Sequence, residues 1–157
     1  ASHYGALIGA IDQFVHSFAL GHGYHICALR PTGIYGVARP IQRSKWFQLI
    51  RDVVDGKQVT CCRGGKEVHA ADVAKAVELL LGAEQVAGEV FNCYDRYVSE
   101  YEVARIANEI SGKECQIEGE RKQPKHQIET GKLRSIGMQF GGEPLLRKTI
   151  GELIGNP

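Results

Sequence analysis

Apolar positions recur with a helical period in several separate segments of the chain. The clearest is 70–81, an alanine-rich stretch that places Val73, Val77 and Leu80 on one side of a helix. In the segment 3–20 the apolar residues are spaced at i, i+3, i+4 and i+7, and the glycines that follow suit a helix C-cap. The periodicity predicts helices over 3–20, 45–54, 70–81, 99–110, 133–136 and 145–154.

Short apolar runs with β character lie between the predicted helices. Glycine, proline or polar residues bound these runs, as they do at the ends of strands. The runs predict strands over 24–29, 58–62, 88–93 and 115–118. Loops or turns are predicted over the intervening stretches 30–44, 63–65 and 119–130. The alternation of helices and strands predicts the α/β class.

Two of the predicted helices carry start signals. Ser99 is a candidate N-cap, and Glu102 follows three residues later, as in a capping box. Asp72 lies in the first turn of the helix over 70–81, where the helix dipole favours an acidic side chain. These two acids therefore have structural explanations that need no catalytic role.

The composition fits one compact domain. The 157 residues are 43% hydrophobic and 24% charged, and 19 Lys and Arg against 18 Asp and Glu give a net charge of +1. A chain of this length can bury a core without disulfide bonds. Because the charges are balanced and scattered, we expect no nucleic-acid partner. No stretch approaches the roughly 20 apolar residues of a membrane span, so no membrane partner is expected either.

The cysteines and histidines indicate neither a disulfide framework nor a metal site. There are five cysteines, an odd number, and none of them forms a C-x-x-C motif. Reduced, structural cysteines and the lack of a basic-then-apolar leader lead us to expect a cytoplasmic location. The histidines show no i, i+4 pairing, so no metal is expected. The cysteines are Cys27, Cys61, Cys62, Cys93 and Cys115.

Several short motifs occur in a fixed order along the chain. They are Tyr4-Gly5, Leu29-Arg30-Pro31, Ile34-Tyr35-Gly36, Val68-His69, Asp72-Val73-Ala74, Gly88-Glu89 and Lys132-Leu133-Arg134. Each motif is short, but the ordered set resembles the extended short-chain dehydrogenase/reductase family, the NAD-dependent epimerases and dehydratases. The resemblance concerns the C-terminal half of that family only.

The resemblance implies an α/β fold that is only partly Rossmann-like. Residues 1–157 are expected to form a single α/β unit. Within it, 1–36 resemble the last strands and helices of a Rossmann domain, and 37–157 mostly resemble the C-terminal substrate-binding subdomain. The N-terminal dinucleotide-binding half is expected to be absent, because the sequence contains no Gly-x-x-Gly-x-x-Gly turn.

The tyrosine that transfers a proton in this family matches Tyr4. In the family, a lysine four residues later lies on the same helical face, lowers the tyrosine pKa from about 10 and binds the nicotinamide ribose. That position is Ile8, whose side chain carries neither a charge nor a hydrogen-bond donor. The alternative for Tyr4 is a packed or surface tyrosine without a catalytic role.

The resemblance also implies a cofactor-binding loop. In the family, this loop contacts the nicotinamide of NAD or NADP, and its threonine position faces the substrate. A turn fixed by a proline and a glycine explains the same residues without a cofactor. The matching residues are Pro31, Thr32, Gly33 and Ile34.

An arginine that grips the substrate diphosphate in many family members has no counterpart here. Its position is occupied by Gly65. Arg63 or Lys66 could replace it as a phosphate ligand, and the alternative is a solvated charge on a turn. In the family, the pair formed by His69 and Asp72 is structural.

Two functions are compatible with these features. The first is a C-terminal portion of an epimerase/dehydratase-like protein that is not catalytic by itself and binds no NAD or NADP alone. The second is an active epimerase, dehydratase or reductase on a sugar-like or small carbonyl substrate, once an N-terminal half is supplied. We also expect a homo-oligomer formed through residues 3–29, because an apolar helix stripe and a strand edge would otherwise be exposed.

Overall fold

The computed structural model describes residues 3–155, which form two compact units. Unit 1 consists of the chain up to Pro31, Val73–Cys93 and Ile128–Gln139. Unit 2 consists of Thr32–Asp72, Tyr94–Gln127 and the chain from Phe140 onward. Each unit is thus assembled from three separate stretches of sequence. The division at residue 36 that the resemblance implies stays a prediction.

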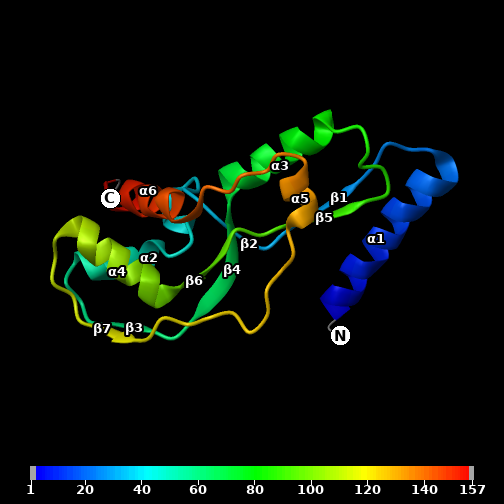
Figure 1. Ribbon diagram of the computed structural model, residues 1–157. Coiled ribbons are helices and arrows are strands. Elements are labelled where there is room, and N and C mark those ends of the chain that lie inside the picture. The colour runs from blue at the N-terminus through cyan, green and yellow to red at the C-terminus, as the bar shows by residue number, and fades with distance from the viewer. Residues whose placement is uncertain (1–2, 156–157) are drawn as a thin grey trace. The chain divides into compact units, whose positions relative to one another are not determined.

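Unit 1 is built on one pair of parallel strands. β1 (Ala28–Pro31) pairs with β5 (Val90–Cys93), and Leu29 lies opposite Phe91. A parallel pair needs a long crossover connection, which explains why distant segments of sequence meet here. The unit also contains α1 (His3–His22), most of α3 (Ala70–Gly82) and α5 (Gly131–Ser135) (Figure 1).

The strand predicted over 24–29 is displaced along the sequence. The amide of Ile26 donates to the carbonyl of Tyr24 at 3.0 Å, so this stretch forms a three-residue turn. The ladder begins only at Ala28, whose amide donates to the carbonyl of Glu89 at 3.0 Å. Before the ladder, the carbonyl of Ile26 accepts a hydrogen bond from the amide of Gly88 at 2.8 Å, and the side chains of Tyr24 and Ile26 are exposed.

Unit 2 carries a three-stranded sheet in the order β2-β4-β6 (Figure 1). β2 (Gly33–Tyr35) pairs in parallel with β4 (Gly64–His69), and β6 (Arg96–Ser99) pairs with β4 in the antiparallel direction. A separate parallel pair joins β3 (Val59–Cys61) to β7 (Ile117–Gly119).

All three strands of this sheet are missing from the sequence-based prediction. The loop expected over 30–44 contains β2 and a 3₁₀ turn (Ile41–Arg43), and the turn expected over 63–65 overlaps the start of β4. No strand was expected where β6 lies. The reason is physical: these strands are short and rich in glycine or charge, and their hydrogen bonds come from segments about 30 residues away.

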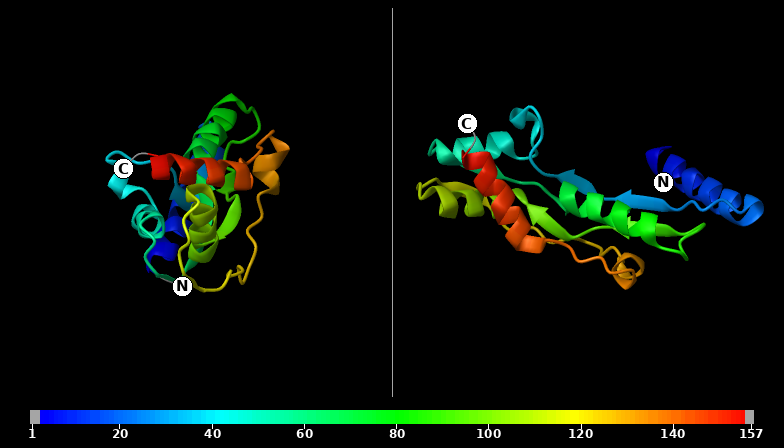
Figure 2. Two further views of the ribbon diagram at one scale, coloured as in Figure 1. Left: turned by 90° about the vertical axis from the view of Figure 1, so that its left-hand side faces the viewer. Right: turned by 90° about the horizontal axis from the view of Figure 1, so that it is seen from above.

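The remaining elements of unit 2 are helices around one core. The helices are α2 (Phe47–Val54), α4 (Glu100–Ser111) and α6 (Gly142–Gly155), which pack against each other in Figure 2. Each fully buried Val, Leu or Ile contributes about 1.5–3 kcal/mol of transfer free energy. The fully buried apolar side chains of these helices include Ile50, Val53, Val103, Leu146 and Ile150.

The start of α6 is held by two carboxylates from other parts of unit 2. Asp72 accepts a hydrogen bond from the amide of Gly141, and Asp95 accepts one from the amide of Gly142, both at 3.0 Å. The first amides of a helix lack partners within the helix, and the helix dipole favours negative charge beside them. Asp72 therefore has a structural role.

The predicted cap of α4 is confirmed in part. Ser99 is the N-cap, and its hydroxyl accepts a hydrogen bond from the amide of Glu102 at 3.2 Å. The reciprocal half of the capping box does not form: Oε1 of Glu102 accepts from two arginines, and Oε2 is buried without a hydrogen-bond partner within residues 3–155. Arg96 donates to its Oε1 at 2.5 Å and Arg121 at 3.4 Å. Charge-assisted bonds of this kind are stronger than a bond to a neutral amide.

We predict that Ser99→Ala lowers the free energy of unfolding of unit 2 by about 1 kcal/mol, because the Glu102 amide loses its acceptor. Urea unfolding followed by circular dichroism measures this loss. The exposed Ser135→Ala, outside unit 2, is the control and should change stability far less. An unchanged midpoint for Ser99→Ala would contradict the capping role.

Candidate functional site

Tyr4 lies on the surface of α1. Its side chain is 73% exposed, and Ile8 follows one helical turn later on the same face. The sequence of α1 contains no lysine at any position. Tyr4 thus lies exposed on a helix that carries no lysine, and its role in proton transfer stays a prediction.

The four residues expected to contact a cofactor lie at the passage from β1 to β2. Pro31 ends β1, Thr32 opens unit 2, and Gly33 and Ile34 lie in β2. A Cβ atom at Gly33 would come within 2.5 Å of Oε2 of Glu67, so this position has no room for a side chain. Gly33 and Gly36 therefore do not open a helix around a phosphate; the first lies in a strand and the second in the bend after it.

A buried ion pair lies beside this passage, within unit 2. Nζ of Lys45 donates to both carboxylate oxygens of Glu67, at 2.6 and 2.5 Å. Glu67 is only 3% exposed, whereas the side chain of Lys45 is 37% exposed. Burial raises the pKa of Glu67, and the neighbouring Lys45 opposes that rise. The lysine is held by a fixed partner and still reaches solvent.

The ion pair lines a hollow of about 410 Å³ in unit 2. Its walls come from the segment before α2, the start of β4 and the junction of β6 with α4. Of the two candidate phosphate ligands, Arg63 lines this hollow and Lys66 does not. Lys66 directly precedes Glu67 in β4, and successive side chains of a strand point to opposite faces of the sheet. The Lys66 side chain therefore points away from the face that carries Glu67. The lining residues are Lys45, Trp46, Arg63, Gly64, Gly65, Glu67, Val98 and Glu100.

Trp46 has an unusual backbone in this lining. Its φ of 65° and ψ of 5° lie in the left-handed region, which costs a bulky residue free energy. The indole packs against the ring of Tyr35, with centroids 5.3 Å apart, and Nζ of Lys45 lies 5.3 Å from its centroid. Residues held in strained conformations cluster at functional sites.

Sequence reasoning missed the roles of Lys45 and Glu67. Lys45 falls at the start of the helix predicted over 45–54, whereas α2 begins only at Phe47, and its partner lies 22 residues away in a strand that was not predicted. No signal in the sequence distinguishes Glu67 from the other acids, because its burial depends on the pairing of β4 with β2 and β6.

His69 and Asp72 do not form a base with its orienting acid. Nδ1 of His69 accepts a hydrogen bond from the amide of Ala71 at 3.0 Å, and burial lowers the pKa of His69. The ring packs edge-on against Tyr35, with centroids 5.0 Å apart. Burial raises the pKa of Tyr35 far above the neutral range, so its hydroxyl keeps its proton. This cluster is structural.

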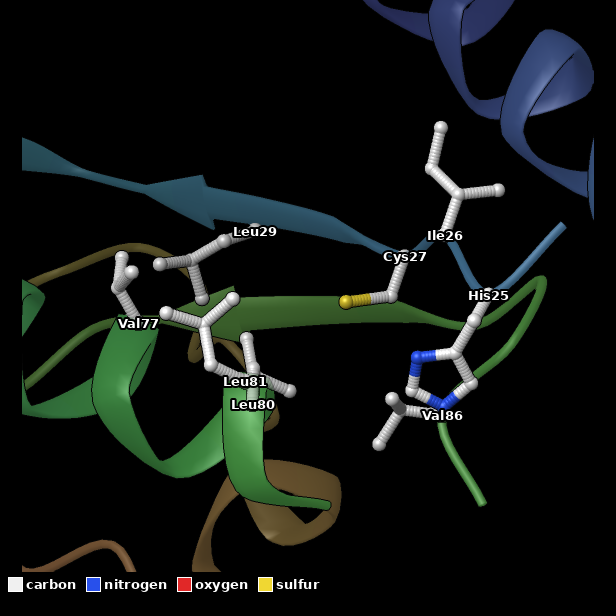
Figure 3. Close-up of a pocket in the computed structure, with 8 residues that line it drawn as sticks. All are labelled: His25, Ile26, Cys27, Leu29, Val77, Leu80, Leu81 and Val86. Atoms are coloured by element: carbon white, nitrogen blue, oxygen red, sulfur yellow. The ribbon is translucent and has the colours of Figure 1, made fainter. Parts of the chain in front are cut away.

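Unit 1 contains a different, mostly apolar hollow of about 320 Å³ (Figure 3). Side chains of the β1 segment and of α3 face it, and Cys27 contributes its thiol. Burial raises the pKa of that thiol, which keeps it protonated and unreactive. This lining offers packing surface and no paired acid or base. Its residues are His25, Ile26, Cys27, Leu29, Val77, Leu80, Leu81 and Val86.

Among residues 3–155, no three His, Cys, Asp or Glu side chains are arranged to hold a metal ion. None of the described helices has both the length and the apolar character needed to cross a membrane.

We predict a pH signature for Glu67. Because its folded-state pKa lies above the ordinary glutamate value of 4.5, the folded chain keeps a proton that the unfolded chain has lost. The free energy of unfolding should therefore fall as the pH rises from the ordinary value through the raised one. Glu67→Gln removes this contribution, so the variant should lose less stability over that window.

Urea unfolding between pH 4 and 7 measures the difference, and the exposed Glu114→Gln is the control. Equal slopes for Glu67→Gln and the wild type would contradict the burial.

Comparison with solved structures shows where this fold occurs. UDP-N-acetylglucosamine 4-epimerase from Methanobrevibacter ruminantium, in complex with UDP-N-acetylmuramic acid, matches 100% of this chain over 55% of its own, with a TM-score of 0.73 and 15% identity. UDP-glucose 4-epimerase from Thermotoga maritima matches 97% of this chain over 52% of its own, with a TM-score of 0.69 and 21% identity. RMD from Pseudomonas aeruginosa, complexed with NADPH, matches 92% over 51%, with a TM-score of 0.70 and 13% identity.

These matches establish a Rossmann-like α/β fold, and the chain spans about half the length of the solved structures it resembles. No curated protein matches the sequence. The sequence profile of the NAD dependent epimerase/dehydratase family matches residues 1–93, which is more than half of the chain. The chain therefore belongs to the NAD dependent epimerase/dehydratase family.

Proposed function

We propose that this chain supplies the substrate-binding portion of an epimerase/dehydratase-like protein and does not catalyse hydride transfer by itself. One observation carries the proposal: Ile8 lies one turn after Tyr4 on α1, where the proton-transferring tyrosine of the family needs a lysine. An isoleucine can neither stabilise a tyrosinate nor bind a ribose hydroxyl.

The residues present do not fit a bound dinucleotide. A pyrophosphate requires a glycine turn that opens onto the N-terminus of a helix. Gly33 lies in β2, and the carboxylate of Glu67 fills the space above it. On this proposal, Pro31, Thr32, Gly33 and Ile34 do not hold NAD or NADP in this chain by itself.

The substrate-binding role is supported by the hollow in unit 2. It combines the aromatic face of Trp46 with the cationic side chains of Lys45 and Arg63. We assign Arg63 as the ligand for the polar end of a small substrate, with Thr32 at the neighbouring β1–β2 passage. Lys66 stays a secondary candidate, because it lies outside this lining.

A second function is favoured by the likeness to complete epimerases. If further residues of the natural protein supply a dinucleotide site, Tyr4 would be the proton-transfer residue. The protein would then act as an epimerase, dehydratase or reductase on a sugar-like or small carbonyl substrate.

Self-association through residues 3–29 belongs to the same proposal. Apolar side chains are exposed along α1: Leu7 at 52%, Ile11 at 53% and Phe14 at 64%. A contiguous apolar stripe of this kind is typical of an interface.

We predict that residues 1–157 give no heat of binding with NAD or NADH at millimolar concentration in isothermal titration calorimetry. Without a glycine turn or a lysine partner, no side chain on α1 fixes the cofactor. Micromolar binding would overturn the proposal that the chain alone is not catalytic.

A second prediction concerns the position of the lysine. If the natural protein has further residues that supply a dinucleotide site, Ile8→Lys in that protein should raise turnover at least tenfold. The reason is that the lysine restores the positive charge beside Tyr4. Ala6→Lys, which places the charge on a different face of α1, is the matched control. Tyr4→Phe in the Ile8→Lys protein should abolish the gain. An unchanged rate would remove Tyr4 from the mechanism.

The oligomer is tested by light scattering over a range of protein concentrations. We expect a mass above 17.3 kDa that falls on dilution, and a shift to the monomer mass in Phe14→Asp. A monomer at every concentration would exclude association through residues 3–29.

A further inference from the structure

We propose that residues 120–127 form a strap that Arg121 tethers to α4, and that the strap closes when the guanidinium binds both oxygens of the buried Glu102 carboxylate. The strap follows β7 in unit 2 and is drawn in yellow in Figure 1. The inference concerns the opening and closing of this segment, and it does not depend on the proposed binding of a substrate.

The first argument is that few contacts fix the strap. Residues 120–127 form no helix or strand, and all of them except Pro124 are exposed. Among them, only Arg121 makes a hydrogen bond or an ion pair with the rest of residues 3–155. A segment with so few buried contacts opens locally at a low cost in free energy. The bond of Arg121 therefore controls how often the strap leaves α4.

The second argument is the burial of the acceptor. Nη2 of Arg121 donates to Oε1 of Glu102 at 3.4 Å, and the side chain of Glu102 is only 10% exposed. Water screens a bond to a buried carboxylate less than it screens a bond between two exposed side chains. The side chain of Arg121 is itself 58% exposed, so the guanidinium can exchange this bond for water when the strap opens.

The third argument is an unfilled acceptor on Glu102. Its Oε1 also accepts from Arg96 at 2.5 Å, whereas its Oε2 is buried with no hydrogen-bond partner within residues 3–155. A buried polar atom without a partner is costly, and a guanidinium can bind both oxygens of a carboxylate through two parallel N–H groups. A shift of Arg121 toward Oε2 would therefore satisfy the buried oxygen and replace one long bond by two.

The fourth argument is the space beside the pair. Arg121 and Glu102 line a hollow of about 190 Å³ in unit 2, whose other lining residues belong to α4 and α6. The two other arginines of this lining, Arg105 and Arg147, are paired with other carboxylates of these helices. Arg121 pairs with Glu102 alone, so it is the arginine of this lining that can close onto Oε2 without giving up another partner.

Limited proteolysis with endoproteinase Lys-C tests the tether, because this protease cleaves the strap after Lys122 and Lys125 but not after arginine. Arg121→Gln therefore changes no cleavage site. It should speed cleavage at these two lysines by about three- to tenfold, since cleavage follows the population of the open segment. Arg105→Gln, which breaks an arginine–glutamate pair on α4 outside the strap, is the matched control and should leave the rate unchanged. Equal rates in Arg121→Gln and the wild type overturn the proposal.

A double-mutant cycle tests whether Glu102 is the partner. Glu102→Gln keeps the shape of the side chain and should also speed cleavage of the strap. The protein with both Arg121→Gln and Glu102→Gln should be cleaved no faster than the faster single variant, because both changes break the same pair. Rate increases that multiply in the double variant overturn the proposed pairing. If Glu102→Gln does not fold, as judged by circular dichroism, Arg121→Gln and its control decide the outcome.

Closure onto both oxygens has a spectroscopic signature of its own. A guanidinium held by two bonds rotates slowly about its Cζ–Nε bond, so its two terminal nitrogens give separate signals in the nuclear magnetic resonance spectrum of protein with isotope-labelled arginine. We expect separate signals for Arg121 at low temperature and low salt, assigned by their loss in Arg121→Gln. A single averaged signal overturns the closure onto Oε2. These measurements involve no NAD and no turnover, so their failure is distinct from failure of the proposed function.

Discussion

The buried carboxylate of Glu67 constrains the candidate site more than any other group. A carboxylate removed from water must be neutralised or paired, and here Lys45 pairs with both of its oxygens. The pairing fixes the segment before α2 against β4, although the two lie 22 residues apart in sequence. It also explains the glycines at positions 33 and 65, because a Cβ atom at either would collide with the Glu67 carboxylate. One ion pair thus determines the residue type on two strands.

Carboxylates also fix the position of helix α6 in unit 2. Asp72 and Asp95, from different stretches of the chain, accept the hydrogen bonds of the Gly141 and Gly142 amides at the start of α6. These bonds orient α6, whose apolar residues Leu146 and Ile150 then complete the core. Short polar contacts between distant segments therefore specify the register of the unit, and apolar burial supplies most of its stability.

The helices could largely be predicted from the sequence, but the sheet of unit 2 could not. Helical periodicity is a local signal, and the predicted helix over 70–81 agrees with α3 to within one residue. β4 begins with two glycines, a lysine and a glutamate, so no alternation of apolar and polar residues marks it. It becomes a strand because β2 and β6 supply its hydrogen bonds. The candidate site was hard to predict for the same reason. Arg63 could be named from the sequence as a candidate ligand, whereas Lys45 and Glu67 become neighbours only through a sheet that the sequence does not predict.

The departures from the family pattern in unit 2 are physically coupled. The resemblance implies an arginine at position 65, but any side chain there would meet the carboxylate of Glu67. Glu67 cannot move aside freely, because Lys45 holds both of its oxygens. The glycine at position 65 is therefore coupled to the ion pair, because a side chain there would require the Glu67 carboxylate and the Lys45 ammonium to move. The cations of the lining are Lys45 and Arg63, and the carboxylates of Glu67 and Glu100 lie in the same lining. Any ligand in this hollow would meet two cations and two carboxylates, so the charge that the lining presents depends on the pairing of Glu67 with Lys45.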